Sequence, residues 1–170
     1  IANGTGVRVS LFVSGCRHRC KNCFNSEAWD FGYGKPFTED TANEIIEALK
    51  PDYITGFSLL GGEPFEPENQ LELLKLLRLI KEKLPNKSVW CYTGFLYDSQ
   101  LLSGKVGDGE TVKEMLKNID VLVDGKFVEE LKSPDLLFRG SSNQRIIDVK
   151  KSMESGTAQW LSGVWQRKMG

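Results

Sequence analysis

The sequence lacks the features that would place this chain in a membrane or on a nucleic acid. No apolar run approaches the ~20 residues that a membrane-spanning helix needs, and no signal-peptide pattern opens the chain. The formal net charge is -1, from 22 Lys and Arg against 23 Asp and Glu, and long basic runs are absent. We therefore expect a cytosolic protein that has neither a membrane nor a nucleic acid as a partner.

Histidine and cysteine are also scarce. The chain has one histidine, His18, and four cysteines in 170 residues. Cys16, Cys20 and Cys23 fall within one short stretch, whereas Cys91 is far along the chain. This crowding fits a metal site in a reducing compartment better than a disulfide framework, and we expect Cys91 to be a core residue.

The spacing Cys-x3-Cys-x2-Cys limits what the three neighbouring thiols can hold. A structural zinc site needs four protein ligands, and the only further candidates are His18 in the same stretch and the distant Cys91. A cubane iron-sulfur cluster takes one cysteine per iron, so three cysteines leave one iron free to bind a small molecule. The spacing therefore favours a 4Fe-4S cluster held by Cys16, Cys20 and Cys23. A zinc-binding interaction module is the alternative from a different class.

Strand and helix patterns alternate along the chain. Residues 7–13 alternate apolar and polar side chains, as a half-buried strand does, and they lead directly into the cysteines. Apolar residues at helical spacing predict helices near residues 38–50, 67–84 and 112–119, and short apolar stretches predict strands at residues 53–60, 89–92, 121–123 and 146–149. The polar stretch 97–109, with three glycines, predicts an irregular connection.

This alternation is typical of parallel βαβ units. A closed barrel of eight units needs ~250 residues, so the chain is too short for one. We predict an α/β fold, an incomplete (β/α) barrel of about five or six mainly parallel strands, over residues 1–149. Residues 150–170 are charged and contain glycines, with Trp160 and Trp165 as their only strong anchors, and we expect a mobile or partner-docking tail there.

Five segments of the chain, the cysteine stretch among them, together resemble one known family. They are residues 1–23, Gly61-Gly62-Glu63-Pro64, Tyr92-Thr93-Gly94-Phe95, Asp124-Gly125-Lys126-Phe127 and Arg139-Gly140-Ser141-Ser142-Asn143-Gln144-Arg145. Cys-x3-Cys-x2-Cys after the first strand is the signature of radical S-adenosylmethionine enzymes. The whole set resembles one branch of them, the activating proteins of anaerobic ribonucleotide reductases.

The resemblance implies an oxidoreductase with a defined reaction. S-adenosylmethionine would chelate the open iron, and one electron from the reduced cluster would break its bond between sulfur and C5'. The resulting 5'-deoxyadenosyl radical would take hydrogen from a backbone glycine of the large subunit of the anaerobic reductase, leaving a stored glycyl radical. The implied partners are that subunit and an electron donor such as flavodoxin or ferredoxin.

The resemblance also implies contacts to the cofactor. Gly61 and Gly62 would receive the methionyl ammonium with Glu63 as a charge partner, and Lys126 would pair with the methionyl carboxylate. Asp124 would contact the ligand or orient Lys126. Taken singly, Gly61-Gly62 is equally typical of an ordinary strand-to-helix turn, and Asp124-Gly125-Lys126 is more typical of a turn with a solvated charge.

Four more residues complete the expected contacts. Thr93 ends a predicted strand, and Arg139 would contact the ligand or the partner protein. Asn22 and Phe24 flank the third cysteine, where the adenine is expected; family members often have an aromatic residue before this cysteine, whereas here Phe24 follows it.

Two other radical enzymes remain as alternatives. One acts on a small molecule, as the 7-carboxy-7-deazaguanine synthases do, and these are also short chains. The other is the activase of pyruvate formate-lyase, which is usually longer. The segment from Arg139 to Arg145 favours the reductase activase over both.

Overall fold

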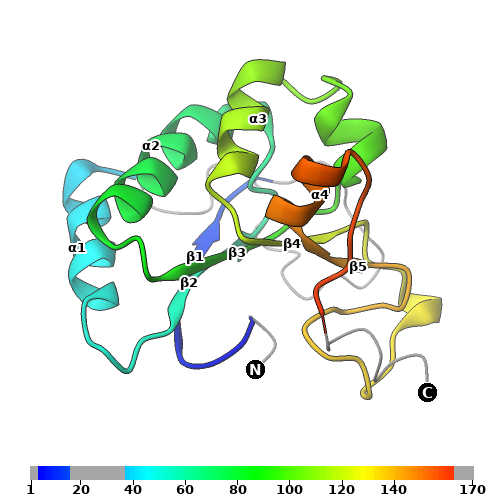
Figure 1. The fold of residues 1–170 in the computed structure, drawn as a ribbon, viewed down its shortest axis with the longest axis horizontal. Helices are drawn as coiled ribbons and strands as arrows, with labels where there is room; N and C mark the ends of the chain where they lie inside the picture. The colour runs from blue at the N-terminus through cyan, green and yellow to red at the C-terminus, as the bar shows by residue number, and fades with distance from the viewer. Residues whose placement is uncertain (1–3, 16–36, 163–170) are drawn as a thin grey trace.

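The computed structural model describes residues 4–15 and 37–162, which form one five-stranded sheet with helices packed on it (Figure 1). The strands are β1 (Arg8–Val13), β2 (Gly56–Gly61), β3 (Ser88–Tyr92), β4 (Val121–Asp124) and β5 (Arg145–Asp148). The helices are α1 (Glu39–Leu49), α2 (Pro67–Lys83), α3 (Gly109–Lys117) and α4 (Val149–Ser155), with single turns at η2 (Tyr97–Leu102) and η3 (Glu129–Leu131).

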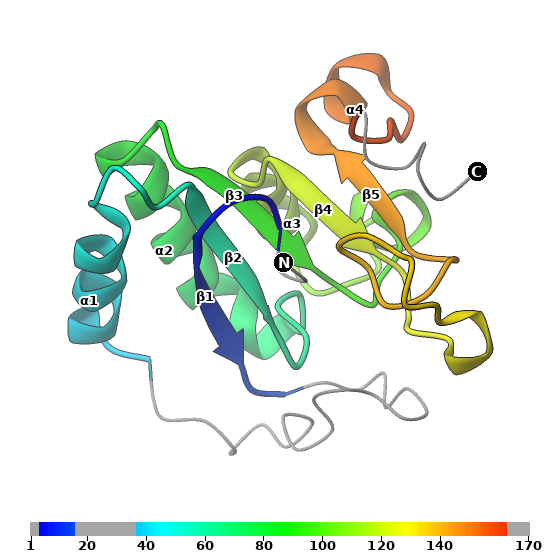
Figure 2. The same ribbon diagram turned by 90° about the horizontal axis from the view of Figure 1, so that it is seen from below.

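The strands lie in the sheet in chain order, β1-β2-β3-β4-β5. β1 to β4 are parallel, and β5 runs antiparallel to β4. α1, α2 and α3 all cover the same face of the sheet (Figures 1 and 2). Because each connection steps to the next strand in the same direction, the sheet is wound like a section of a barrel. The predicted incomplete barrel of mainly parallel strands is confirmed.

Local signals explain where the helices begin. Thr38 caps α1 by accepting a hydrogen bond from the Thr41 amide at 3.3 Å, and Pro67 opens α2. α2 is 17 residues long, and no helix within residues 4–15 and 37–162 is long and apolar enough to cross a membrane. The helices bury one apolar stripe each on the sheet, including Ile45, Leu49, Leu73, Leu77, Ile80, Val112 and Leu116.

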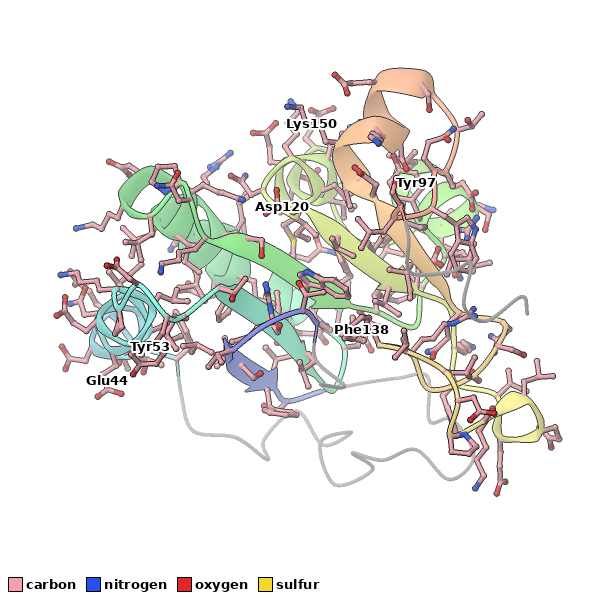
Figure 3. All side chains as sticks on the ribbon, turned by 60° about the horizontal axis from the view of Figure 1, so that its bottom comes forward. Glu44, Tyr53, Tyr97, Asp120, Phe138 and Lys150 are labelled. Carbon is pink, nitrogen blue, oxygen red and sulfur yellow. The ribbon has the colours of Figure 1, made fainter. Side chains whose placement is uncertain are left out.

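The sheet face opposite α1, α2 and α3 carries a second, smaller core. Trp90, Val121, Val123 and Ile146 are buried there. Phe138 lies on this side of the sheet (Figure 3), and its ring packs edge-on against Trp90, with ring centroids 5.3 Å apart. The backbone of Phe138 has a φ of 62°, which is unusual for an aromatic residue.

The guanidinium of Arg8 fills the end of this face where the parallel strands begin. Its nitrogens donate to Ser58 Oγ at 2.8 Å, to the Phe57 carbonyl at 2.9 Å and to the Ser88 carbonyl at 2.8 Å. Arg8 also lies 5.8 Å from the Trp90 ring centroid. Burial lowers the pKa of Arg8 to about 10. Ligands of parallel α/β folds bind at the opposite end, where β1 to β4 finish.

The beginning of the predicted tail is part of the packed domain. α4 begins at Val149, with Ser152 buried. After it, Trp160 forms an antiparallel bridge with Ile147, and the Leu161 amide donates to the Ile146 carbonyl at 2.8 Å. The chain thus returns along β5, which sequence periodicity does not reveal. Residues 163–170 lie outside the described part of the chain.

Candidate functional site

The carboxyl ends of β1, β2, β3 and β4 meet at one edge of the sheet (Figure 2). We call this edge the rim and define it as residues 13–15, 61–63, 92–94 and 124–126. Ligands of parallel α/β folds bind at such an edge. The cysteine segment follows directly after the first part of the rim.

The loop after β2 is hydrogen-bonded to the residues that precede the first cysteine. The Gly62 amide donates to the Val13 carbonyl at 2.7 Å, and the Glu63 amide donates to the Gly15 carbonyl at 2.7 Å. A Cβ on Gly61, whose φ is 110°, would lie 2.4 Å from the Val13 nitrogen. Only glycine permits this close approach, and the two hydrogen bonds hold the segments in contact.

The side chain of Glu63 joins the loop after β2 to the loop after β3. Its carboxylate is fully buried and accepts hydrogen bonds from Thr93 Oγ1 at 2.7 Å, the Phe65 amide at 2.8 Å and the Gly94 amide at 2.7 Å. The structure thus brings the predicted residues Gly61, Glu63 and Thr93 together. It turns the carboxylate of Glu63 toward protein donors, and contact of Glu63 with an ammonium ligand stays a prediction.

Asp124 is buried at the end of β4 and pairs with Arg145. The Arg145 guanidinium donates to both Asp124 oxygens, at 2.6 and 3.0 Å, and the Tyr97 amide donates to Asp124 Oδ2 at 2.8 Å. Arg145 also bonds both oxygens of Asp98, at 3.1 Å each, and this hydrogen bonding lowers the pKa of Asp98. Arg145 and the Tyr97 amide therefore hold the Asp124 carboxylate, and contact of Asp124 with the ligand or with Lys126 stays a prediction.

Lys126 is exposed on the loop that follows. Its carbonyl accepts from Asn143 Nδ2 at 2.8 Å, and the Gly125 carbonyl before it accepts from Gln144 Nε2 at 2.9 Å. The Gly125 amide donates to the Phe95 carbonyl at 3.2 Å, which links this loop to the one after β3. The backbone of Lys126 is thus fixed while its ammonium group is accessible to an anion.

Arg139 closes its own loop. Its Nη1 donates to the Ser142 carbonyl at 3.0 Å and to the Gln144 carbonyl at 2.7 Å, and its guanidinium lies 5.2 Å from the Trp160 ring centroid. Burial lowers the pKa of Arg139. These contacts give it a part in the structure of the segment, and its contact with a ligand or partner stays a prediction.

The predicted cluster ligands Cys16, Cys20 and Cys23 lie outside the described residues, as do Asn22 and Phe24. Within residues 4–15 and 37–162, no group of His, Cys, Asp and Glu could hold a metal ion. Cys91 is fully buried in the core under the helices, and burial, with a smaller effect of Glu63, raises the pKa of its thiol. The expectation that Cys91 is a core residue is confirmed.

Sequence reasoning missed one residue of this edge and the role of another. Asn69, in the first turn of α2, donates to carbonyls of both the β1 and the β2 loops. Arg145 is expected only as the last residue of the Arg139 to Arg145 segment, yet its guanidinium holds Asp124. Both contacts join segments far apart in the chain, and the only available signal was that each residue stands close to a glycine-containing loop.

Comparison with known proteins gives consistent matches. The family model described as "4Fe-4S single cluster domain" matches residues 2–147. An anaerobic ribonucleoside-triphosphate reductase-activating protein of Escherichia coli (strain K12) is 42% identical over 146 residues, covering 85% of this chain and 90% of the relative. Proteins of the same description from Vibrio cholerae and from Enterobacteria phage T4 are 41% and 39% identical, covering 86% and 85% of this chain and 90% and 85% of the relatives.

Proposed function

The chain belongs to the family of anaerobic ribonucleoside-triphosphate reductase-activating proteins, and from this membership we propose that it is the activase of an anaerobic ribonucleotide reductase. In this proposal it binds a 4Fe-4S cluster and S-adenosylmethionine and removes one hydrogen from a backbone glycine of the reductase. The membership carries the proposal, and the rim supports it, because the Gly61 to Glu63 loop is hydrogen-bonded to the residues just before Cys16.

The residues of the chain fit the cluster. In this proposal Cys16, Cys20 and Cys23 supply three thiolates, and Cys91, which is fully buried in the core, supplies none. When bound, the cluster supplies the electron for reductive cleavage of S-adenosylmethionine and an open iron for its amino and carboxylate groups.

The rim residues bind and orient the cofactor in this proposal. Because its side chain is held by Thr93 and Gly94, Glu63 fixes the loop, and the backbone of Gly61 and Gly62 can face the methionyl ammonium. The exposed ammonium group of Lys126 at the end of β4 suits the methionyl carboxylate.

The Lys126 assignment predicts a loss of cofactor affinity. Lys126→Ala should weaken the binding of S-adenosylmethionine to the reconstituted protein by roughly 1 to 3 kcal/mol, through loss of a charge-assisted hydrogen bond. Equilibrium binding measures this change. Lys75→Ala removes an exposed lysine on α2 and should leave the affinity unchanged. Equal affinity in native protein and Lys126→Ala would remove Lys126 from the site.

A protein substrate suits the open sheet. In residues 4–15 and 37–162 the sheet has five strands and does not close, and Phe12 on β1 is 55% exposed on the face without α1, α2 and α3. An open side gives room for a loop of another folded protein, whereas an enzyme of small molecules gains by closing over its substrate. We propose the glycine-bearing loop of the reductase as that substrate, and a flavodoxin or ferredoxin as the electron donor.

One experiment tests the function. The anaerobically reconstituted chain, S-adenosylmethionine, a reductant and the anaerobic reductase are mixed, and electron paramagnetic resonance and 5'-deoxyadenosine are measured. We expect a persistent doublet from a glycyl radical and release of 5'-deoxyadenosine. Cofactor cleavage without a radical on an associated reductase would refute the activase and leave the small-molecule enzyme as the better candidate.

A further inference from the structure

The side chain of Asn69 connects two loops of the rim. Asn69 lies in the first turn of α2, and its Nδ2 donates to the Ser14 carbonyl at 3.1 Å and to the Glu63 carbonyl at 2.9 Å. An amide nitrogen has two hydrogens, so both are used. One bond reaches 55 residues back along the chain, to the segment that leads into Cys16.

Asn69 completes a set of three contacts on successive carbonyls. The carbonyls of Val13 and Gly15 accept from backbone amides of the loop after β2, at 2.7 Å each. The Ser14 carbonyl between them accepts from the side chain of Asn69. The last three residues before the cysteine segment are therefore all held from the β2–α2 side.

Helix capping does not explain this arrangement. An asparagine at a helix start usually accepts a hydrogen bond from a backbone amide of the first turn. The N-cap residue of α2 is Glu66, which makes no capping side-chain hydrogen bond, and Asn69 acts as a donor to two carbonyls outside the helix. Its bonds therefore stabilise the rim.

We propose that Asn69 is a positioning residue for the iron-sulfur cluster. By fixing the backbone at Ser14, two residues before Cys16, it sets where the cysteine segment leaves β1 relative to the loop that receives the cofactor. This inference rests on the proposed function, because it needs Cys16 to be a cluster ligand.

The first test uses the metal-free chain and compares Asn69→Asp with Asn118→Asp. Asn118 is a matched control, since it ends α3 and its Nδ2 also donates to a backbone carbonyl, that of Glu114, at 2.8 Å. An acidic residue is favourable in the first turn of a helix and unfavourable at its end. The control is therefore the variant more prone to general destabilisation.

Amide hydrogen exchange at Gly62 and Glu63 provides the readout, because these amides donate to Val13 and Gly15. We expect roughly tenfold faster exchange in Asn69→Asp, because this variant loses both part-buried hydrogen bonds of Asn69, and native exchange in Asn118→Asp. Should Asn69→Asp not fold, Asn69→Leu removes the same donors without adding charge. Native exchange in the Asn69 variant, or equal acceleration in both variants, overturns the proposal.

The second test measures the loaded protein without relying on its activity. Iron transfer from the reconstituted cluster to a colorimetric chelator should be roughly tenfold faster in Asn69→Asp and unchanged in Asn118→Asp. If the native chain binds no iron, the proposed function fails. If the native chain binds iron and releases it at the same rate as Asn69→Asp, only the role of Asn69 fails.

Discussion

At the scale of single residues, a carboxylate removed from water is stable only when it is hydrogen-bonded, and Glu63 meets this condition with donors from two loops. Glu63→Gln preserves the size of the side chain but places an amide nitrogen against an N–H or O–H donor. We expect it to lower the free energy of unfolding of the metal-free chain by about 1 to 3 kcal/mol, measured by urea titration.

Glu72→Gln is the matched control for Glu63. Glu72 is exposed and pairs with Lys75 at 3.3 Å, so its loss should cost less than about 1 kcal/mol. Similar losses in the two variants would show that the buried bonds of Glu63 contribute little to stability.

Asp98 gives the chain a defined dependence on pH. Hydrogen bonding from Arg145 lowers the pKa of Asp98 in the folded state. Its ion pair therefore stabilises the fold fully above the ordinary carboxyl pKa of about 3.9, and this contribution is lost as the pH falls through the lowered value. Asp98→Asn should cost less than about 1 kcal/mol at neutral pH, because Asp98 is exposed. In urea titrations at several pH values, the difference from native protein should shrink below about pH 4, and a constant difference would contradict this origin.

At the scale of elements, the junction of β1 and β2 depends on Gly61. Its added Cβ would lie 2.4 Å from the Val13 nitrogen and 2.6 Å from the Val13 oxygen, and backbone atoms cannot move aside without breaking the pairing of the strands. We expect Gly61→Ala to cost more than about 3 kcal/mol, measured by urea or thermal unfolding.

Gly104→Ala separates this contact from the cost of the backbone conformation. Gly104 also has a positive φ, 79°, but a Cβ there would meet nothing within 4 Å. Its replacement should cost only about 1 to 2 kcal/mol. If both alanine variants lose the same free energy, the close approach of Gly61 to β1 is not what its glycine provides.

The predictable elements are those specified by nearby residues. Thr38, Pro51 and Pro85 placed the ends of α1 and α2 to within a few residues, since capping and termination are local. The strand predicted from residue 53 begins only at Gly56, and Tyr53 is 73% exposed. The return of residues 159–161 along β5 was missed, because it depends on hydrogen bonds to Ile146 and Asp148 that no local pattern encodes.

At the scale of the whole molecule, strand order decides how much of the site a sequence can reveal. Ligands of parallel α/β folds bind where the strands end, so the glycine-containing strand ends are expected at one shared edge of the sheet, and the structure has them there. The sequence could not say which side chain meets which across it. Thr93 lies 30 residues beyond Glu63, and Arg145 lies 21 beyond Asp124, and both pairings exist only because β2, β3, β4 and β5 lie next to one another.

The distribution of thiols over the whole molecule gives the last prediction. Anaerobic reconstitution should load the chain with about four iron and four sulfide, because a cubane cluster with one open iron needs three thiolates. Alanine at Cys16, Cys20 or Cys23 should abolish cluster-dependent activity and lower the iron content. Cys91→Ala should keep the native iron content, because Cys91 is fully buried under the helices and burial raises the pKa of its thiol, which disfavours the thiolate that binds iron. Iron and sulfide analysis of the four variants tests which cysteines bind the cluster. If only Cys91→Ala loses the cluster, the ligands assigned above are wrong. Zinc bound without iron or sulfide would favour an interaction module over a radical enzyme.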